Sequence, residues 1–73
     1  MWIMIQNKLL RLARERRGVS QSELARIAGV SRSTIVRLER DLSYAVIPSV
    51  RKAVSDALGI SLAEVFPRHA EDD

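Results

Sequence analysis

The stretch that decides the fold is RERRGVSQSELARIAGVSRSTIVRLER, residues 14–40. Ser20 stands three residues before Glu23, the capping-box spacing in which each side chain hydrogen-bonds a backbone N–H that the first helical turn leaves free. Gly29 can adopt the left-handed conformation that ends a helix, and Ser31 is suited to cap the next helix at once. Because the second helix restarts so soon, the stretch predicts two short helices that cross steeply instead of lying antiparallel.

The flanking sequence predicts three more helices and no strand. Apolar residues recur at helical spacing before Gly18 and between Pro48 and Gly59, where proline suits a first helical turn and glycine a helix end. Ser61 and Glu64 repeat the capping-box spacing. The predicted fold class is therefore all-α, a compact bundle of five short helices. We expect these helices at residues about 6–17, 20–28, 31–40, 48–58 and 61–66.

A length of 73 residues allows one small domain. We expect this domain to span residues 1–67 and residues 68–73 to form an acidic, flexible tail. The chain has no Cys, and its one His, His69, lies in that tail, so we expect no disulfide, no metal site and no cofactor. The apolar start is far shorter than the roughly 20 residues of a membrane span, so we expect a cytoplasmic protein without membrane contact.

The charges are unevenly placed along the chain. Residues 1–52 carry eleven of the twelve Lys and Arg residues and four acids, a net charge of +7, whereas residues 53–73 have a net charge of −4. This asymmetry suits a basic face presented to a polyanion, with the acidic part turned away. The same uneven distribution of charged residues also occurs in helical proteins whose charged side chains are simply solvated. Charge alone therefore leaves both interpretations open.

A steep crossing makes the helix near residues 32–40 protrude from the bundle. Arg32, Arg37 and several small polar side chains lie along its outer face, and such a helix fits the roughly 12 Å width of the DNA major groove. Any small helical bundle needs turns of this kind, so the turn by itself also agrees with a purely structural role.

The residues of this stretch resemble the lambda-repressor-like, or Xre/Cro-type, helix-turn-helix family. The resemblance rests on Ser-Gln at 20–21, Glu-Leu-Ala at 23–25, Ala-Gly-Val-Ser at 28–31 and Leu-Glu at 38–39, and residues 57–66 are more weakly similar to the family's closing helices. It implies a transcriptional regulator that binds double-stranded DNA, a repressor or autoregulator reading an inverted-repeat operator. It also implies a homodimer associated with the nucleoid, with no enzymatic activity and no small-molecule substrate.

The resemblance also assigns roles to individual residues. The candidates for reading bases are Arg32, Ser33, Thr34 and Arg37. The candidates for contacting phosphates are Gln21, Ser31, Arg40 and Ser43. Arg14 and Glu39 match an ion pair that joins the first and third helices of the family. Asp41 stands where the family usually has Gly, and the connection 41–47 is longer and more apolar than expected, which puts loop contacts to phosphate in doubt.

A dimer contact is expected on apolar surface away from the basic face. The last helix is ranked first, by resemblance to family members that pair there, and the apolar connection and the N-terminus follow. The candidate interface residues are Leu62, Val65, Phe66, Trp2, Ile3, Tyr44 and Val46.

Other function classes fit the sequence less well. The chain has no Gly-rich phosphate loop and no paired carboxylates in a plausible pocket, which argues against an enzyme. RNA binding is disfavoured because the major groove of RNA is deep and narrow and the chain lacks an aromatic stacking platform. An adaptor or antitoxin-like regulator, whose main contact is a partner protein, stays open as the alternative.

Overall fold

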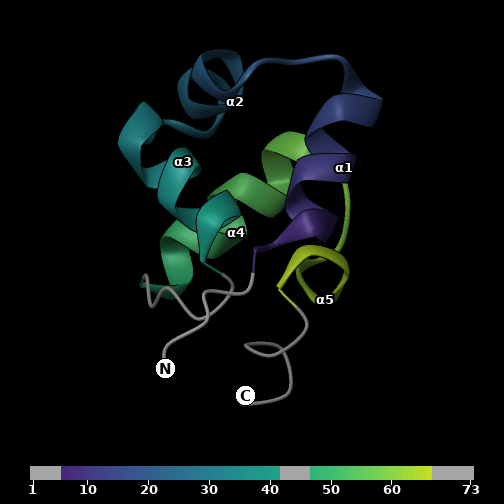
Figure 1. Ribbon diagram of the computed structural model, residues 1–73. Coiled ribbons are helices and arrows are strands. Elements are labelled where there is room, and N and C mark those ends of the chain that lie inside the picture. The colour runs from purple at the N-terminus through teal and green to yellow at the C-terminus, as the bar shows by residue number, and fades with distance from the viewer. Residues whose placement is uncertain (1–5, 42–46, 67–73) are drawn as a thin grey trace, which may run out of the picture.

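The computed structural model describes residues 6–41 and 47–66, and these ranges contain helices and no strand. The predicted all-α bundle of five short helices is confirmed (Figure 1). The helices are α1 (Lys8–Arg17), α2 (Gln21–Ala28), α3 (Arg32–Arg40), α4 (Pro48–Leu58) and α5 (Leu62–Val65).

The starts of α1 and α2 are each fixed by a side chain close by in the sequence. The Asn7 Oδ1 atom accepts a hydrogen bond from Leu10 N at 3.1 Å, which is why α1 begins at Lys8 and not near residue 6. Ser20 Oγ accepts from Glu23 N at 3.0 Å at the start of α2. The Glu23 carboxylate makes its side-chain contacts with Arg26 instead of returning to the cap, so the predicted capping box is half formed.

Gly29 makes the turn between α2 and α3. Its φ angle is +74°, and its N–H and that of Val30 donate to Arg26 O at 3.3 Å and Ala25 O at 3.0 Å, which closes the end of α2. A Cβ atom built at Gly29 would have no neighbour within 4 Å, so the backbone conformation and not the space requires glycine here. Ser31 then caps α3 through its bond from Thr34 N, 3.2 Å long.

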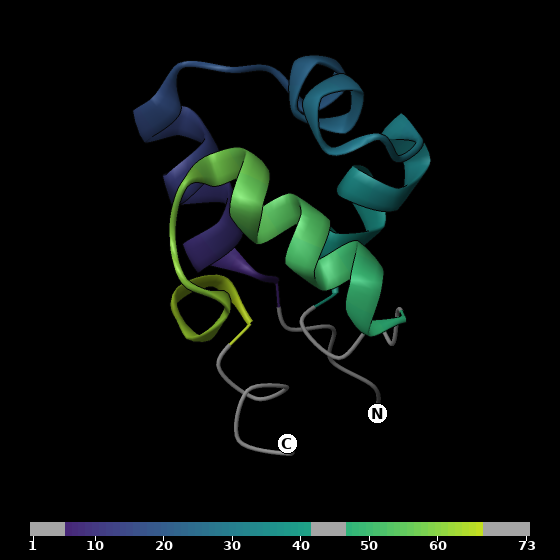
Figure 2. The ribbon, with the colours of Figure 1, turned by 180° about the vertical axis from the view of Figure 1, so that it is seen from behind.

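Every helix contributes to one hydrophobic core. The buried core residues are Leu10, Leu24, Ala25, Ile35, Leu38, Val54, Leu58, Val65 and Phe66. α2 packs on α3 and α4, while α1 contacts α3, α4 and α5. Figures 1 and 2 show α3 and α5 on opposite sides of the molecule, with α4 passing between them. The outer face of α3 is therefore left uncovered by the other described helices.

A buried asparagine joins three elements across the core. Asn7, only 2% exposed, donates from its backbone N–H to Glu39 O at 2.8 Å and from Nδ2 to Val65 O at 2.8 Å. It thereby ties the start of α1 to the end of α3 and to α5. Asn7 is not among the residues expected from the sequence, although an Asn directly before an amphipathic helix is a common N-cap.

The structure changes the expectation for the last helix. Val65 is 0% and Phe66 is 2% exposed, because both side chains close the core beneath α1 and α4. Neither offers surface to a second copy, and this corrects the expectation that they contact one. Leu62 is half-buried against the core. The other interface candidates, Trp2, Ile3, Tyr44 and Val46, lie outside the described residues, as do Ser43 and the expected tail 68–73.

No helix within residues 6–41 and 47–66 is both long enough and apolar enough to cross a membrane. The same two ranges contain no group of three or more side chains that could hold a metal ion.

Candidate nucleic-acid interface

The outer face of α3 is mainly basic and polar, because Ile35 and Leu38 are turned into the core. Ile35 and Leu38 are 0% and 2% exposed, while Arg32, Ser33 and Arg37 are exposed. A shallow hollow of about 520 Å³ runs along this face. It is lined by Arg32, Ser33, Val36, Arg37, Arg40 and Asp41. The structure thus brings three of the four predicted base-reading residues, together with Arg40, onto one surface.

Thr34, the fourth predicted base-reading residue, is placed differently. Its side chain is half-buried, and its Oγ1 lies 2.9 Å from Ser31 Oγ within the cap of α3. Ser31 also accepts the bond from Thr34 N. Both hydroxyls are therefore engaged at the start of α3, which favours a structural role for this pair.

Arg32 and Arg40 make no ion pair with any residue in 6–41 or 47–66. On α2, by contrast, the Arg26 side chain hydrogen-bonds Glu23, and its charge adds to this effect, so the pKa of Glu23 lies below its ordinary value. The guanidinium groups at the two ends of α3 keep their hydrogen-bond donors for a group outside the described chain. Free guanidinium groups of this kind suit phosphate oxygens and the acceptor edge of guanine.

A second, smaller hollow of about 330 Å³ lies where α1, the start of α2 and the end of α3 meet. It is lined by Gln6, Arg11, Arg14, Glu15, Gln21, Glu39 and Arg40. Gln6 and Arg11 were not identified from the sequence, because nothing in their local pattern distinguishes them from ordinary exposed residues. Arg11 is paired with Glu15 one helical turn away, at 3.2 Å. The two predicted phosphate-contacting residues Gln21 and Arg40 share this hollow.

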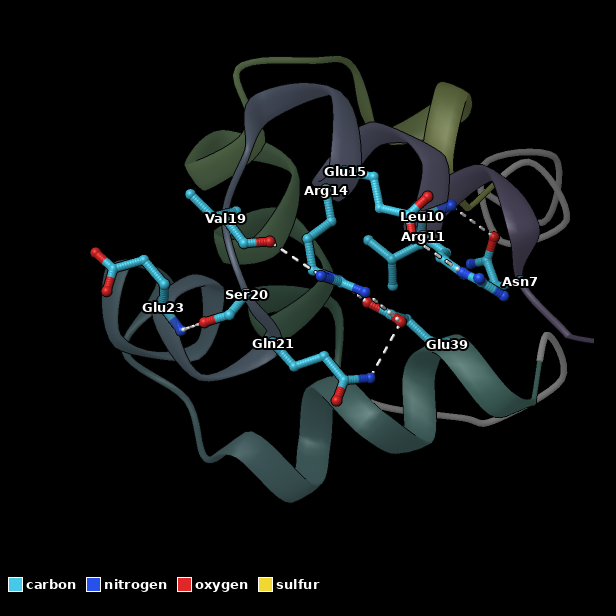
Figure 3. A network of polar contacts seen from close by, with 10 residues as sticks. All are labelled: Asn7, Leu10, Arg11, Arg14, Glu15, Val19, Ser20, Gln21, Glu23 and Glu39. Atoms are coloured by element: carbon cyan, nitrogen blue, oxygen red, sulfur yellow. Dashed lines mark hydrogen bonds and ion pairs between the residues drawn. The ribbon is translucent and has the colours of Figure 1, made fainter.

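Arg14 and Glu39, which both line this hollow, form a closely spaced ion pair (Figure 3). Arg14 Nε lies 2.6 Å from Glu39 Oε2, Nη2 lies 3.4 Å from Oε1, and the side chains are 14% and 7% exposed. Arg14 Nη1 also donates to Val19 O at 2.9 Å, in the connection between α1 and α2. This pair holds α1, its connection and α3 together through charge-assisted hydrogen bonds.

Gln21 joins the same network from the first turn of α2. Its Nε2 atom donates to Glu39 Oε1 at 3.2 Å, as Figure 3 shows. Its backbone N–H and that of Ser22 have no hydrogen-bond partner among the described residues, as is usual in a first helical turn. Gln21 lines one hollow together with Arg40, and free amides at a helix start are suited to an anionic oxygen.

Comparisons with known proteins agree with this geometry. Residues 10–65 match a family model of helix-turn-helix domains. The structure is also similar to the crystal structure of the clp gene regulator ClgR from C. glutamicum, with a TM-score of 0.70 and 33% sequence identity. That match covers 90% of this chain and 84% of the other. No curated protein matches the chain.

Proposed function

The chain belongs to the lambda-repressor-like (Xre/Cro) family of helix-turn-helix DNA-binding domains, and from this premise we propose that it is a sequence-specific transcriptional regulator. The family is one of DNA-binding regulators and not of enzymes. The observation that carries the proposal is the basic outer face of α3, where Arg32, Ser33 and Arg37 are exposed beside a shallow hollow. In the proposed complex, α3 lies in the major groove of double-stranded DNA.

Three side chains of α3 are proposed to read bases. Arg32 and Arg37 carry planar forks of N–H donors that match the O6 and N7 acceptors of guanine, and Ser33 can donate to or accept from either base pair. Thr34 is left with its methyl group as a contact for thymine, because its hydroxyl is paired with Ser31.

The surroundings of α3 are proposed to bind the DNA backbone. Gln21, the free amides at the start of α2 and Arg40 at the end of α3 are the proposed phosphate contacts, and Gln21 and Arg40 line one hollow. Such contacts hold the protein in place without reading sequence. Ser31 is exposed, and its hydroxyl accepts a hydrogen bond from Thr34 N in the cap of α3. Any contact of this hydroxyl with a phosphate is proposed to form in addition to that cap bond.

We propose that the regulator acts as a homodimer in the cytoplasm and that it is a repressor or autoregulator. Three or four base-reading side chains cover too few base pairs for useful selectivity, and a two-fold symmetric pair doubles the site. Among the interface candidates Leu62, Val65 and Phe66, Leu62 keeps partial exposure for such a contact. The operator is accordingly expected to be an inverted repeat.

Selection of bound sequences from a random duplex library tests the proposal. We expect enrichment of an inverted repeat whose half-sites lie about 34 Å apart, one helical turn of DNA. Enrichment of a single half-site would contradict the proposed dimer but would still agree with a sequence-specific regulator. No enrichment at any salt concentration would contradict sequence-specific binding and favour a protein-binding adaptor.

A further inference from the structure

One carboxylate of α3 is shared between two other helices. Glu39 Oε2 accepts from Arg14 Nε on α1, and Glu39 Oε1 accepts both from Arg14 Nη2 and from Gln21 Nε2 on α2. An ionised carboxylate offers about four acceptor positions and no donor, so it can serve all three bonds at once. A nearly buried side chain of the proposed recognition helix thus holds the first residue of α2.

The carboxylate also decides which way the Gln21 amide faces. A glutamine amide has one acceptor oxygen and one NH2 group with two donors. Because a carboxylate only accepts, the NH2 group turns toward Glu39 and the oxygen turns away, as Figure 3 shows. One N–H of Gln21 is then bound to Glu39. The second N–H remains for an outside group, at a position fixed relative to α3.

Glu39 is itself held at both its side chain and its backbone. Its carbonyl oxygen accepts from Asn7 N at 2.8 Å, and its carboxylate faces Arg14, whose Nη1 is bound to Val19 O. With the side chain 7% exposed, the carboxylate has little freedom to move. The Gln21 amide is therefore attached to a rigid point and not to another surface side chain.

We propose that Glu39 is a positioning residue for sequence-specific DNA binding, which it serves by holding the Gln21 amide in register with α3. This inference rests on the proposed function. Phosphate contacts set the register of a protein on the duplex, and base contacts specify the sequence. If Gln21 is released, the protein still binds DNA, but its phosphate contact no longer aligns α3 with the bases. Loss of Glu39 then lowers discrimination between sequences more than it lowers general affinity.

The test compares two double variants with the same net charge. Arg14→Met with Glu39→Leu replaces the ion pair by apolar side chains, a change that buried pairs often tolerate. Arg14→Met with Glu39→Gln keeps a carbonyl oxygen that Gln21 can still use. The dissociation constants for the selected operator and for an unrelated duplex are measured at one salt concentration, and their ratio gives the specificity.

We expect the Leu variant to lower the specificity ratio about three- to tenfold, the scale of one hydrogen bond, and the Gln variant to keep most of it. A role in stability alone lowers the folded fraction, which weakens binding to both duplexes by the same factor and leaves the ratio unchanged. Thermal unfolding of each variant gives the folded fraction independently.

Gln21→Ala removes the donor of the hydrogen bond between Gln21 Nε2 and Glu39 Oε1 and leaves the core residues unchanged. We expect it to lower the ratio as the Leu variant does. When it is combined with that variant, we expect no further decrease, because Glu39 acts through Gln21.

Four results separate this inference from the proposed function. A wild-type protein that selects no duplex overturns the proposed function and this inference with it. Specific binding by the wild type, combined with equal ratios for the Leu and Gln variants, overturns the inference alone. So does a Gln21→Ala protein that keeps the wild-type ratio, or an effect of Glu39 that persists in the Gln21→Ala background.

Discussion

Arg32 and Arg40 stand at opposite ends of α3 and are expected to contribute differently to binding. Arg32→Ala should cost about 1–3 kcal/mol on the preferred operator and relax the preference at one base pair, because it removes a bidentate base contact. Arg40→Ala should weaken binding to all duplexes alike and reduce the salt slope by about one unit, because it removes one phosphate contact.

Fluorescence anisotropy titrations on matched and mismatched duplexes at several salt concentrations check both expectations. Arg40→Ala is the natural control for Arg32→Ala, since each removes from the same exposed face one arginine that has no ion pair within residues 6–41 and 47–66. An Arg32→Ala protein that binds every duplex as the wild type does would show that Arg32 reads no base.

At the same scale, local sequence pattern predicted a residue's role where its partner was close in sequence, whereas the distant pair of Arg14 and Glu39 was expected from the family resemblance. Ser31 and Thr34 are three positions apart, and their hydroxyls meet in the cap. Ile27 lies at a helical position that the apolar pattern of α2 groups with Leu24, yet it is 44% exposed while Leu24 is 0% exposed. The apolar pattern predicted which face of α2 turns toward the core. The packing of α3 and α4 against α2 decided which apolar side chains on that face are buried.

The α2–α3 turn is the element on which presentation of α3 depends. Gly29→Ala should destabilise the fold by about 1 kcal/mol, because an L-residue with a side chain pays for the left-handed conformation even where there is room for its Cβ. Gly29→Asn should cost less, because Asn enters this conformation more readily.

Urea unfolding monitored by circular dichroism measures both free energies of unfolding. The Asn variant controls for the added side chain, since it also fills the open space beside Gly29. Equal stability of the Ala variant and the wild type would mean that the turn adopts another conformation in solution.

At the scale of the whole molecule, the helices of the described ranges share one hydrophobic core, and Val65 of α5 is buried in it. Val65→Glu places an unpaired charge where the wild-type side chain is 0% exposed, so we expect loss of the cooperative fold and of helicity. Ala63→Glu introduces the same side chain on the exposed side of the same short helix and should leave helicity intact.

Far-ultraviolet circular dichroism and thermal melting of the two variants provide the comparison. A Val65→Glu protein with native helicity and melting would show that α5 is detached from the core in solution, and would return Val65 to the dimer candidates. With Val65 buried, a solution dimer must use other surface.

The sequence by itself determined the class of fold, the approximate helices and the candidate face of α3. Caps and turns are made by residues within about four positions of one another, as at Ser20 with Glu23 or at Gly29, so their chemistry can be predicted locally. The periodicity of α3 likewise turned Ile35 and Leu38 inward and left Arg32 outside.

Only the tertiary structure decided which distant residues share an environment. Asn7 reaches Val65 across 58 positions, and Gln21 reaches Glu39 across 18, distances over which local sequence rules carry no information. The burial of Val65 follows from how α5 docks against α1 and α4, because burial depends on the surfaces that meet and not on the helix alone. Local hydrogen bonds therefore specified the helices, and packing between them specified the network that holds Gln21 beside α3.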